Sequence, residues 1–127
     1  MARKTLESAR GDCERGDYNW ACFKSQQAAE AAVKGLLHGL GLDAYGHSIS
    51  RLLERLRARG LDTPNKLINM GKTLDKYYIP TRYPNAWAEG SPHDYYTEKD
   101  ASESIEYAEK IIKWVVETWR YLEKGGE

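Results

Sequence analysis

Apolar residues recur every three or four positions along most of the chain, which is the spacing of amphipathic helices. In the last segment, residues 97–125, one such stripe consists of Ile105, Ala108, Ile112, Val115, Trp119 and Leu122. A second stripe, displaced by one residue, consists of Tyr107, Ile111, Trp114 and Tyr121. A bundle helix needs only one apolar face, so we expect this second stripe to form an interface with a long loop or with another subunit.

The segment 17–40 predicts a second long helix, with Asp17 as its cap. Its small residues recur at helical spacing and would let a neighbouring helix approach closely: Ala21, Ser25, Ala28, Ala32, Gly35 and Gly39. A shorter helix is predicted over 48–60, where Ser48 or Ser50 can cap the start and a glycine ends it.

Two further helices complete the pattern. Thr63 and Pro64 predict a helix start, with the threonine hydroxyl as cap and the proline at the first helical position, and the helix extends to Pro80. A short helix is predicted around residues 3–15. Short connections favour antiparallel neighbours, so we predict an all-α fold. It is an up-down antiparallel bundle of four main helices plus a short one, forming a single domain over residues 1–127.

Composition supports a folded protein of this kind. The chain has 127 residues, 41% of them hydrophobic and 11% aromatic, which can support a core and argues against intrinsic disorder although the mean hydropathy is -0.73. No apolar run approaches the roughly 20 residues of a membrane span, and the N-terminus does not resemble a signal peptide. We therefore expect a cytoplasmic protein without a membrane partner, whose Cys13 and Cys22 stay reduced.

Charge is distributed unevenly although the chain carries no net charge. Residues 51–82 contain eight basic and three acidic side chains, a net charge of +5. Residues 98–127 contain five basic and eight acidic side chains, a net charge of −3. The neutral total therefore does not argue against a nucleic-acid ligand, although solvated helix faces would give the same distribution.

The connection from residue 78 to 97 is long for a compact domain and rich in aromatic residues, which favours a functional loop. Arg82 offers five N–H donors that suit a phosphate, and His93 beside Asp94 could act as an acid or a base. Tyrosines could stack on bases: Tyr78, Tyr83, Tyr95 and Tyr96. The structural alternative is that these rings attach the loop to the bundle while Arg82 pairs with a helix carboxylate.

Other candidate motifs are weak. Gly71, Lys72 and Thr73 imitate the end of a phosphate-binding loop, but the required first glycine is absent. Two cysteines and two histidines have no metal-binding spacing and are interpreted as packed thiols and helix-end imidazoles: Cys13, Cys22, His38 and His47. The sequence thus predicts no metal site and no cofactor.

Several segments together resemble the HEPN domain (higher eukaryotes and prokaryotes nucleotide-binding). They are GDYNWACF at 16–23, QQAAE at 26–30, VKGLL at 33–37, HSI at 47–49 and LDKYYIPTRYP at 74–84. The last helix, from Tyr107 and Ala108 onward, also fits, so the resemblance covers nearly the whole chain. The first helix is short beside the family pattern, which leaves an upstream start codon open.

The resemblance implies a helical bundle that usually forms a homodimer. It also implies a minimal nucleotidyltransferase encoded next to it, the two commonly acting as toxin and antitoxin. Many members are ribonucleases with an Arg-x(4–6)-His motif, in which the histidine assists attack by the 2′-hydroxyl. This sequence departs from that motif, because ten residues separate Arg82 from His93.

We therefore expect a homodimer that binds a nucleotide or RNA, partnered by a minimal nucleotidyltransferase, and a binding protein in preference to an enzyme. The expected ligand-binding residues are Lys76, Tyr78, Arg82, Tyr83, Asn85 and Tyr95. One alternative is a metal-independent endoribonuclease using Arg82 and His93. Another is a protein-interaction module without a ligand, binding through the second stripe of the last helix.

Overall fold

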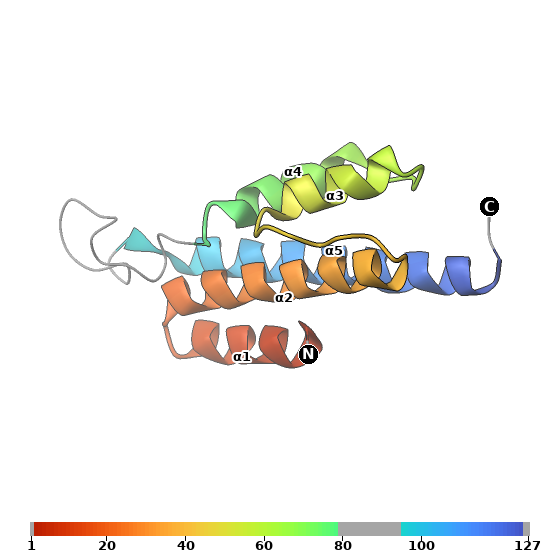
Figure 1. Ribbon diagram of the computed structural model, residues 1–127. Coiled ribbons are helices and arrows are strands. Elements are labelled where there is room, and N and C mark those ends of the chain that lie inside the picture. Colours follow the sequence, from red (N-terminus) through yellow and green to blue (C-terminus); the bar gives the residue numbers. More distant parts are fainter. Residues whose placement is uncertain (1, 79–94, 126–127) are drawn as a thin grey trace.

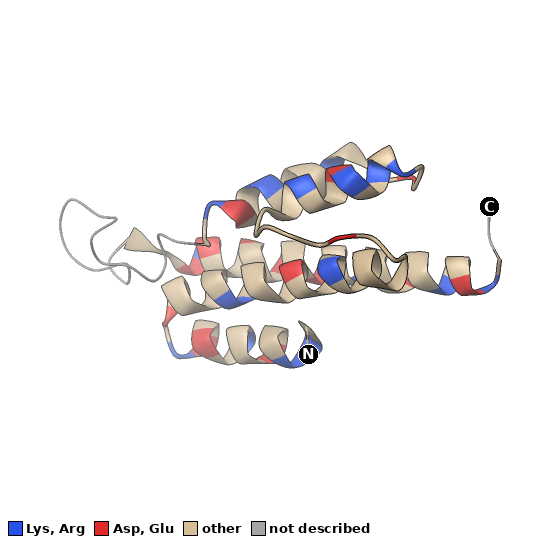
Figure 2. Ribbon diagram, viewed as in Figure 1, with Lys and Arg blue, Asp and Glu red and all other residues tan. Residues whose placement is uncertain are grey.

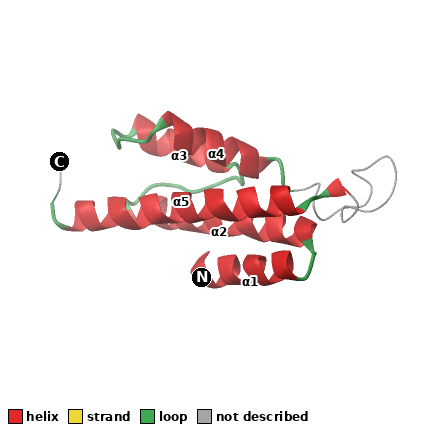
Figure 3. Ribbon diagram, turned by 180° about the vertical axis from the view of Figure 1, so that it is seen from behind, coloured by secondary structure: helices red, strands yellow, loops and turns green. Residues whose placement is uncertain are grey.

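The computed structural model describes residues 2–78 and 95–125, which form five helices. These are α1 (Ala2–Glu14), α2 (Tyr18–Gly39), α3 (Ile49–Ala58), α4 (Asn65–Asp75) and α5 (Glu98–Glu123). The long helices α2 and α5 lie side by side, with α1 on one side of them and the α3–α4 hairpin on the other (Figure 1, Figure 3). The predicted all-α bundle is confirmed.

The helices do not all alternate in direction. The pairs α1–α2 and α3–α4 are antiparallel hairpins, but α2, α3 and α5 point the same way (Figure 1). The reason is the connection 40–48, which runs back along the bundle before α3 begins. Leu42 and Ala44 of this connection pack on the main core, so burial of apolar surface holds it along the helices.

Local signals in the sequence account for the starts of α3 and α5, whereas Asp17 occupies the N-cap position of α2 without forming a side-chain capping hydrogen bond. Thr97 and Asp100 form a capping box at the start of α5, and the Ser48 hydroxyl accepts a hydrogen bond from the Arg51 N–H in α3. At α4 the prediction was wrong at both ends: Pro64 occupies the N-cap position while the Thr63 hydroxyl donates to the carbonyl of Leu61, and the helix ends at Asp75 without continuing toward Pro80.

The main core takes in side chains of all five helices and consists of aliphatic residues, among them Leu6, Leu37, Ile49, Leu74 and Ile111. Of the two glycines in the predicted small-residue stripe, Gly39 meets a neighbouring helix and Gly35 does not, because nothing lies within 4 Å of a Cβ placed on Gly35. A Cβ at Gly39 would lie 2.7 Å from Cζ3 of Trp119 on α5. A Cβ at Gly71 would lie 3.1 Å from the backbone nitrogen of Ser50, so α4 packs closely on the start of α3.

Within residues 2–78 and 95–125, no helix has both the length and the apolar content required to cross a bilayer.

Candidate nucleic-acid interface

The predicted ligand-binding and catalytic residues fall into two groups, those that the structure describes and those that it does not. Arg82, Tyr83, Asn85 and His93 lie outside the described residues, so the ribonuclease alternative remains a prediction. Three of the expected ligand-binding residues are described: Lys76 is exposed and Tyr78 half-buried directly after α4, and Tyr95 is exposed shortly before α5. These three residues mark the end of the bundle at which the sequence predicts a site.

Aromatic packing joins the two ends of this segment. The rings of Tyr77 and Tyr96 meet edge to face, with centroids 5.5 Å apart, in a small cluster that includes Cys22. Burial raises the pKa of the Cys22 thiol to about 12 and that of the Tyr77 phenol to about 12, and it raises the pKa of Tyr96 as well. These groups are neutral at physiological pH, so the cluster closes the end of the bundle and does not supply a nucleophile.

The adjacent surface contains a histidine held by a carboxylate. Nδ1 of His47 lies 3.1 Å from Oε2 of Glu30 on α2, and the imidazole stacks on the Tyr78 ring with centroids 4.4 Å apart. Nζ of Lys34 lies 2.9 Å from the same carboxylate oxygen. Nε2 of the buried Gln26 donates to Oε1 of Glu30 at 2.8 Å and to the carbonyl of His47 at 3.2 Å. Both the ring and the backbone of His47 are thus oriented by α2.

The sequence predicts only a helix-end histidine at position 47 and does not predict its contacts with Glu30 and Tyr78. The residues come from α2, from the connection 40–48 and from the end of α4, so their distances depend on tertiary packing. The one sequence feature that points to His47 is the segment HSI at 47–49, which is part of the family resemblance. By itself this segment indicates only the start of a helix.

The start of α3, next to His47, is already occupied by a carboxylate of the chain. Oδ1 of Asp75 accepts from the N–H of Ile49 at 2.6 Å, and Oδ2 accepts from the hydroxyls of Ser48 and Ser50 at 2.8 and 2.7 Å. This carboxylate satisfies the exposed N–H groups that a phosphate would otherwise use. The helix start is therefore a structural joint between α3 and α4 and is not a ligand site.

Basic side chains dominate the charges of the α3–α4 hairpin (Figure 2). Two of them support the fold: the guanidinium of Arg55 lies 3.8 Å from the ring centroid of Tyr45, and that of Arg57 donates to Oδ1 of Asn65 at 2.7 Å. The remaining ones are exposed, and no ion pair is observed for them within the described part of the chain: Arg51, Arg59, Lys66, Lys72 and Lys76. They form the basic surface, which ends at Lys76 beside Tyr78.

Two weak motifs have no functional geometry. Gly71 and Lys72 lie inside α4, with Gly71 buried against α3, so they cannot form a phosphate-binding loop. Among the residues that the structure describes, no three His, Cys, Asp or Glu side chains come together in a way that could hold a metal ion.

The predicted interface stripe on α5 is only partly available to another subunit. Ile111 is fully buried in the core of this chain, so the prediction that it lies at an interface was wrong, because the stripe covers the boundary between core and surface. Tyr107 and Trp114 are half-buried, and Tyr121 is 52% exposed. Trp119, which belongs to the other apolar stripe of α5, is 37% exposed. The exposed aromatic surface therefore lies near the C-terminal end of α5.

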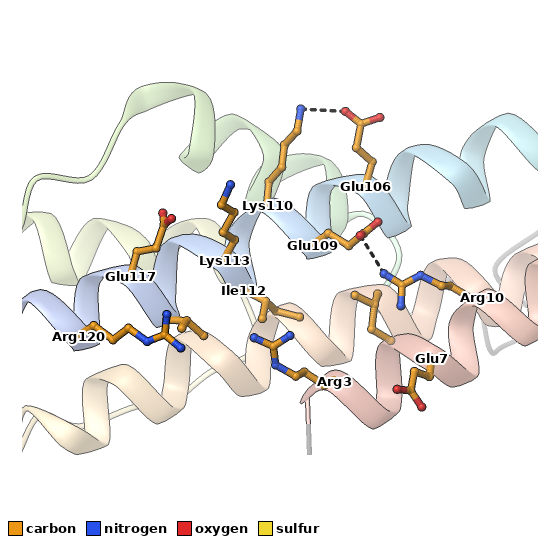
Figure 4. A pocket seen from close by; sticks show the side chains of 12 residues that line it. Arg3, Glu7, Arg10, Glu106, Glu109, Lys110, Ile112, Lys113, Glu117 and Arg120 are labelled. Carbon is orange, nitrogen blue, oxygen red and sulfur yellow. Dashed lines mark hydrogen bonds and ion pairs between the residues drawn. The ribbon is translucent and has the colours of Figure 1, made fainter.

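A groove of about 620 Å³ lies between α1 and α5, on the side of the bundle away from α3–α4 (Figure 4). Basic and acidic side chains alternate along it, and two ion pairs cross it or border it: Arg10 with Glu109 and Lys110 with Glu106, both at 2.8 Å. An anionic polymer would meet repulsive glutamates there, so this groove is a poorer nucleic-acid site than the basic surface.

Comparison with known proteins decides the family. The model of the HEPN domain family matches residues 1–119. The chain belongs to the HEPN family. Comparison with curated protein sequences gives no match.

Solved structures of HEPN proteins agree with this assignment. TT1696 from Thermus thermophilus is 49% identical over 92% of this chain and 91% of its own, with a TM-score of 0.88. ST0689, described as an archaeal HEPN homologue, is 45% identical over 92% of this chain and 90% of its own, with a TM-score of 0.76. A HEPN domain protein from Thermotoga maritima, TM0613, is 39% identical over 94% and 93% of the two chains, with a TM-score of 0.76.

Proposed function

We propose that this HEPN protein is a homodimeric nucleotide- or RNA-binding component of a pair with a minimal nucleotidyltransferase, of the toxin–antitoxin type. The observation that supports ligand binding is the basic surface of α3–α4, which ends at the ordered stack of His47 on Tyr78. Lysines and arginines without carboxylate partners attract phosphates, and aromatic rings beside them can stack on bases.

A titration with single-stranded RNA tests the ligand. Fluorescence anisotropy with a labelled decameric RNA is measured at low salt and over a salt series. Replacing both Lys72→Gln and Lys76→Gln should weaken binding about tenfold and reduce the slope of log K against log salt by about 1.4, for two phosphate contacts to a single strand.

The matched control removes the same charge elsewhere. Lys113 and Lys124 are exposed on α5 and at its end, so the pair Lys113→Gln and Lys124→Gln should change the affinity less than twofold. Equal losses in both double variants would show that only net charge matters. Absence of binding by the wild type, to RNA and to mononucleotides, would contradict the ligand part of the proposal.

The two partner proposals have separate tests. Exposed Trp119 and Tyr121 support self-association, and sedimentation at micromolar concentrations should give a dimer that Tyr121→Glu weakens. A monomer at all these concentrations would contradict the homodimer. For the nucleotidyltransferase, co-expression with the product of the adjacent gene should give a complex, and a neighbour of another class would contradict that pairing.

A further inference from the structure

We propose that His47 recognises the 2′-hydroxyl of a ribonucleotide, so that the site selects RNA over DNA. This inference rests on the proposed nucleic-acid binding and names the feature of the ligand that the site reads. The carboxylate of Glu30, the position of the imidazole and the neighbouring cations support it.

The contact with Glu30 determines which nitrogen of His47 carries the proton. An ionised carboxylate can only accept hydrogen bonds, and Oε2 of Glu30 lies 3.1 Å from Nδ1, so Nδ1 must be the donor. In the neutral ring the other nitrogen, Nε2, is then an acceptor. About half of the side chain, 54%, is exposed, and within the described part of the chain no polar atom bonds Nε2.

The acceptor is held rigidly. Glu30 is mostly buried, with 13% of its side chain exposed, and is itself oriented by Gln26 and Lys34. The Tyr78 ring lies parallel to the imidazole within 14°, which limits rotation of the ring. A ligand group that bonds Nε2 therefore meets a fixed direction, which makes the contact selective.

The chemistry of Nε2 excludes a neutral His47 as a phosphate ligand. A phosphate oxygen is an acceptor and cannot form a hydrogen bond with another acceptor, so the lysines must bind the phosphates. Lys76 is well placed, because the residue before it, Asp75, bonds the residue after His47, Ser48, at 2.8 Å. The donor that accompanies the backbone phosphate in every ribonucleotide is the 2′-hydroxyl, and DNA lacks it.

Three oligonucleotides that differ only at the 2′ position test the inference. Decamers of uridine, 2′-deoxyuridine and 2′-O-methyluridine are titrated by anisotropy at pH 8. The wild type should bind the ribose form about threefold to tenfold more tightly than the other two, the effect of one hydrogen bond. The 2′-O-methyl decamer retains the sugar pucker of RNA but has no hydroxyl donor, so it should bind like the deoxy form.

Two variants separate recognition from packing. His47→Phe keeps a ring to stack on Tyr78 but removes the acceptor, so it should bind all three decamers equally, at the wild-type affinity for the deoxy form. His38→Phe, at an exposed histidine near the end of α2, should retain the ribose preference. Nitrogen-15 NMR of the wild type should show the proton of His47 on Nδ1, and Glu30→Ala should abolish that preference for Nδ1.

The outcomes distinguish the two proposals. The role of His47 would be overturned if the wild type bound the ribose and deoxy decamers equally, or if His47→Phe weakened binding of both to the same extent. A proton on Nε2 would overturn it as well. Each of these results would leave the proposed RNA binding unaffected. If no decamer binds at low salt, the proposed nucleic-acid binding fails, and the recognition of the hydroxyl fails with it.

Discussion

On the α1–α5 side of the bundle, basic and acidic side chains alternate and pair across the groove, whereas the exposed charges of the α3–α4 hairpin are mainly basic and unpaired within the described residues (Figure 2, Figure 4). On the first side, Arg10 and Glu109 neutralise each other. On the second, the carboxylate of Asp75 faces inward to the start of α3. Charges that are compensated inside the chain support its structure, and uncompensated ones are available to a ligand.

The largest effect should follow removal of the carboxylate that anchors the hairpin. Asp75→Ala leaves two serine hydroxyls and the N–H of Ile49 without their charged acceptor, so the free energy of unfolding should fall by about 3 kcal/mol. Urea unfolding followed by circular dichroism measures this loss. The exposed Asp62→Ala should stay within about 0.5 kcal/mol of wild type. A loss below about 1 kcal/mol for Asp75→Ala would show that packing alone holds the hairpin.

A smaller effect on the free energy of unfolding is expected from the cluster of Cys22, Tyr77 and Tyr96, whose uncharged side chains pack at the end of the hairpin. The pKa of Cys22 is about 12 in the folded chain against an ordinary value of 9.0, so only the unfolded chain releases this proton between those pH values. The contribution of Cys22 to stability is therefore complete well below pH 9 and is lost as the pH rises, by about 1.4 kcal/mol at pH 10.

Urea unfolding at pH 8, 9 and 10 measures this decline. Cys22→Ala should flatten the dependence on pH, and Cys13→Ala, at a partly exposed thiol, should not. A decline of the same steepness in Cys22→Ala would assign the effect to other groups.

The smallest effect on stability is expected from the ion pair that crosses the groove between α1 and α5. Arg10 and Glu109 are 44% and 50% exposed, so water and salt screen their attraction, and a double-mutant cycle to alanine should give a coupling below about 0.5 kcal/mol. RNA affinity should not change in either single variant. If Arg10→Ala weakened RNA binding as much as the hairpin variants do, both sides of the bundle would contact the ligand, and the contrast between them would disappear.

Most of the fold could be predicted because its signals are local. The capping box at Thr97 and the hydroxyl cap at Ser48 are formed by residues within three positions of each other, and the apolar spacing of α5 depends only on the helical period. The direction of α3 could not be predicted in the same way. It depends on Leu42 and Ala44 packing on helices that are distant in the sequence.

The candidate site shows the same division. The excess of basic residues over 51–82 can be counted along the chain, and the exposure of Lys72 follows from the face of α4 that it occupies. Ile111 shows the limit of this reasoning, because its stripe is apolar in sequence but its side chain is buried between helices and only Tyr121 of the stripe is well exposed.

The sequence by itself determined the helices, the caps of α3 and α5, the basic middle of the chain and the family resemblance, since each of these depends on residue types at short spacing. Only the tertiary structure decided which residues share a site. His47, Glu30 and Tyr78 come from three separate segments, and a hydrogen bond of 3.1 Å or a ring stack of 4.4 Å exists only after the packed core has brought these segments together. Long-range packing therefore oriented His47 beside the basic surface, using residues whose local patterns carry no such signal.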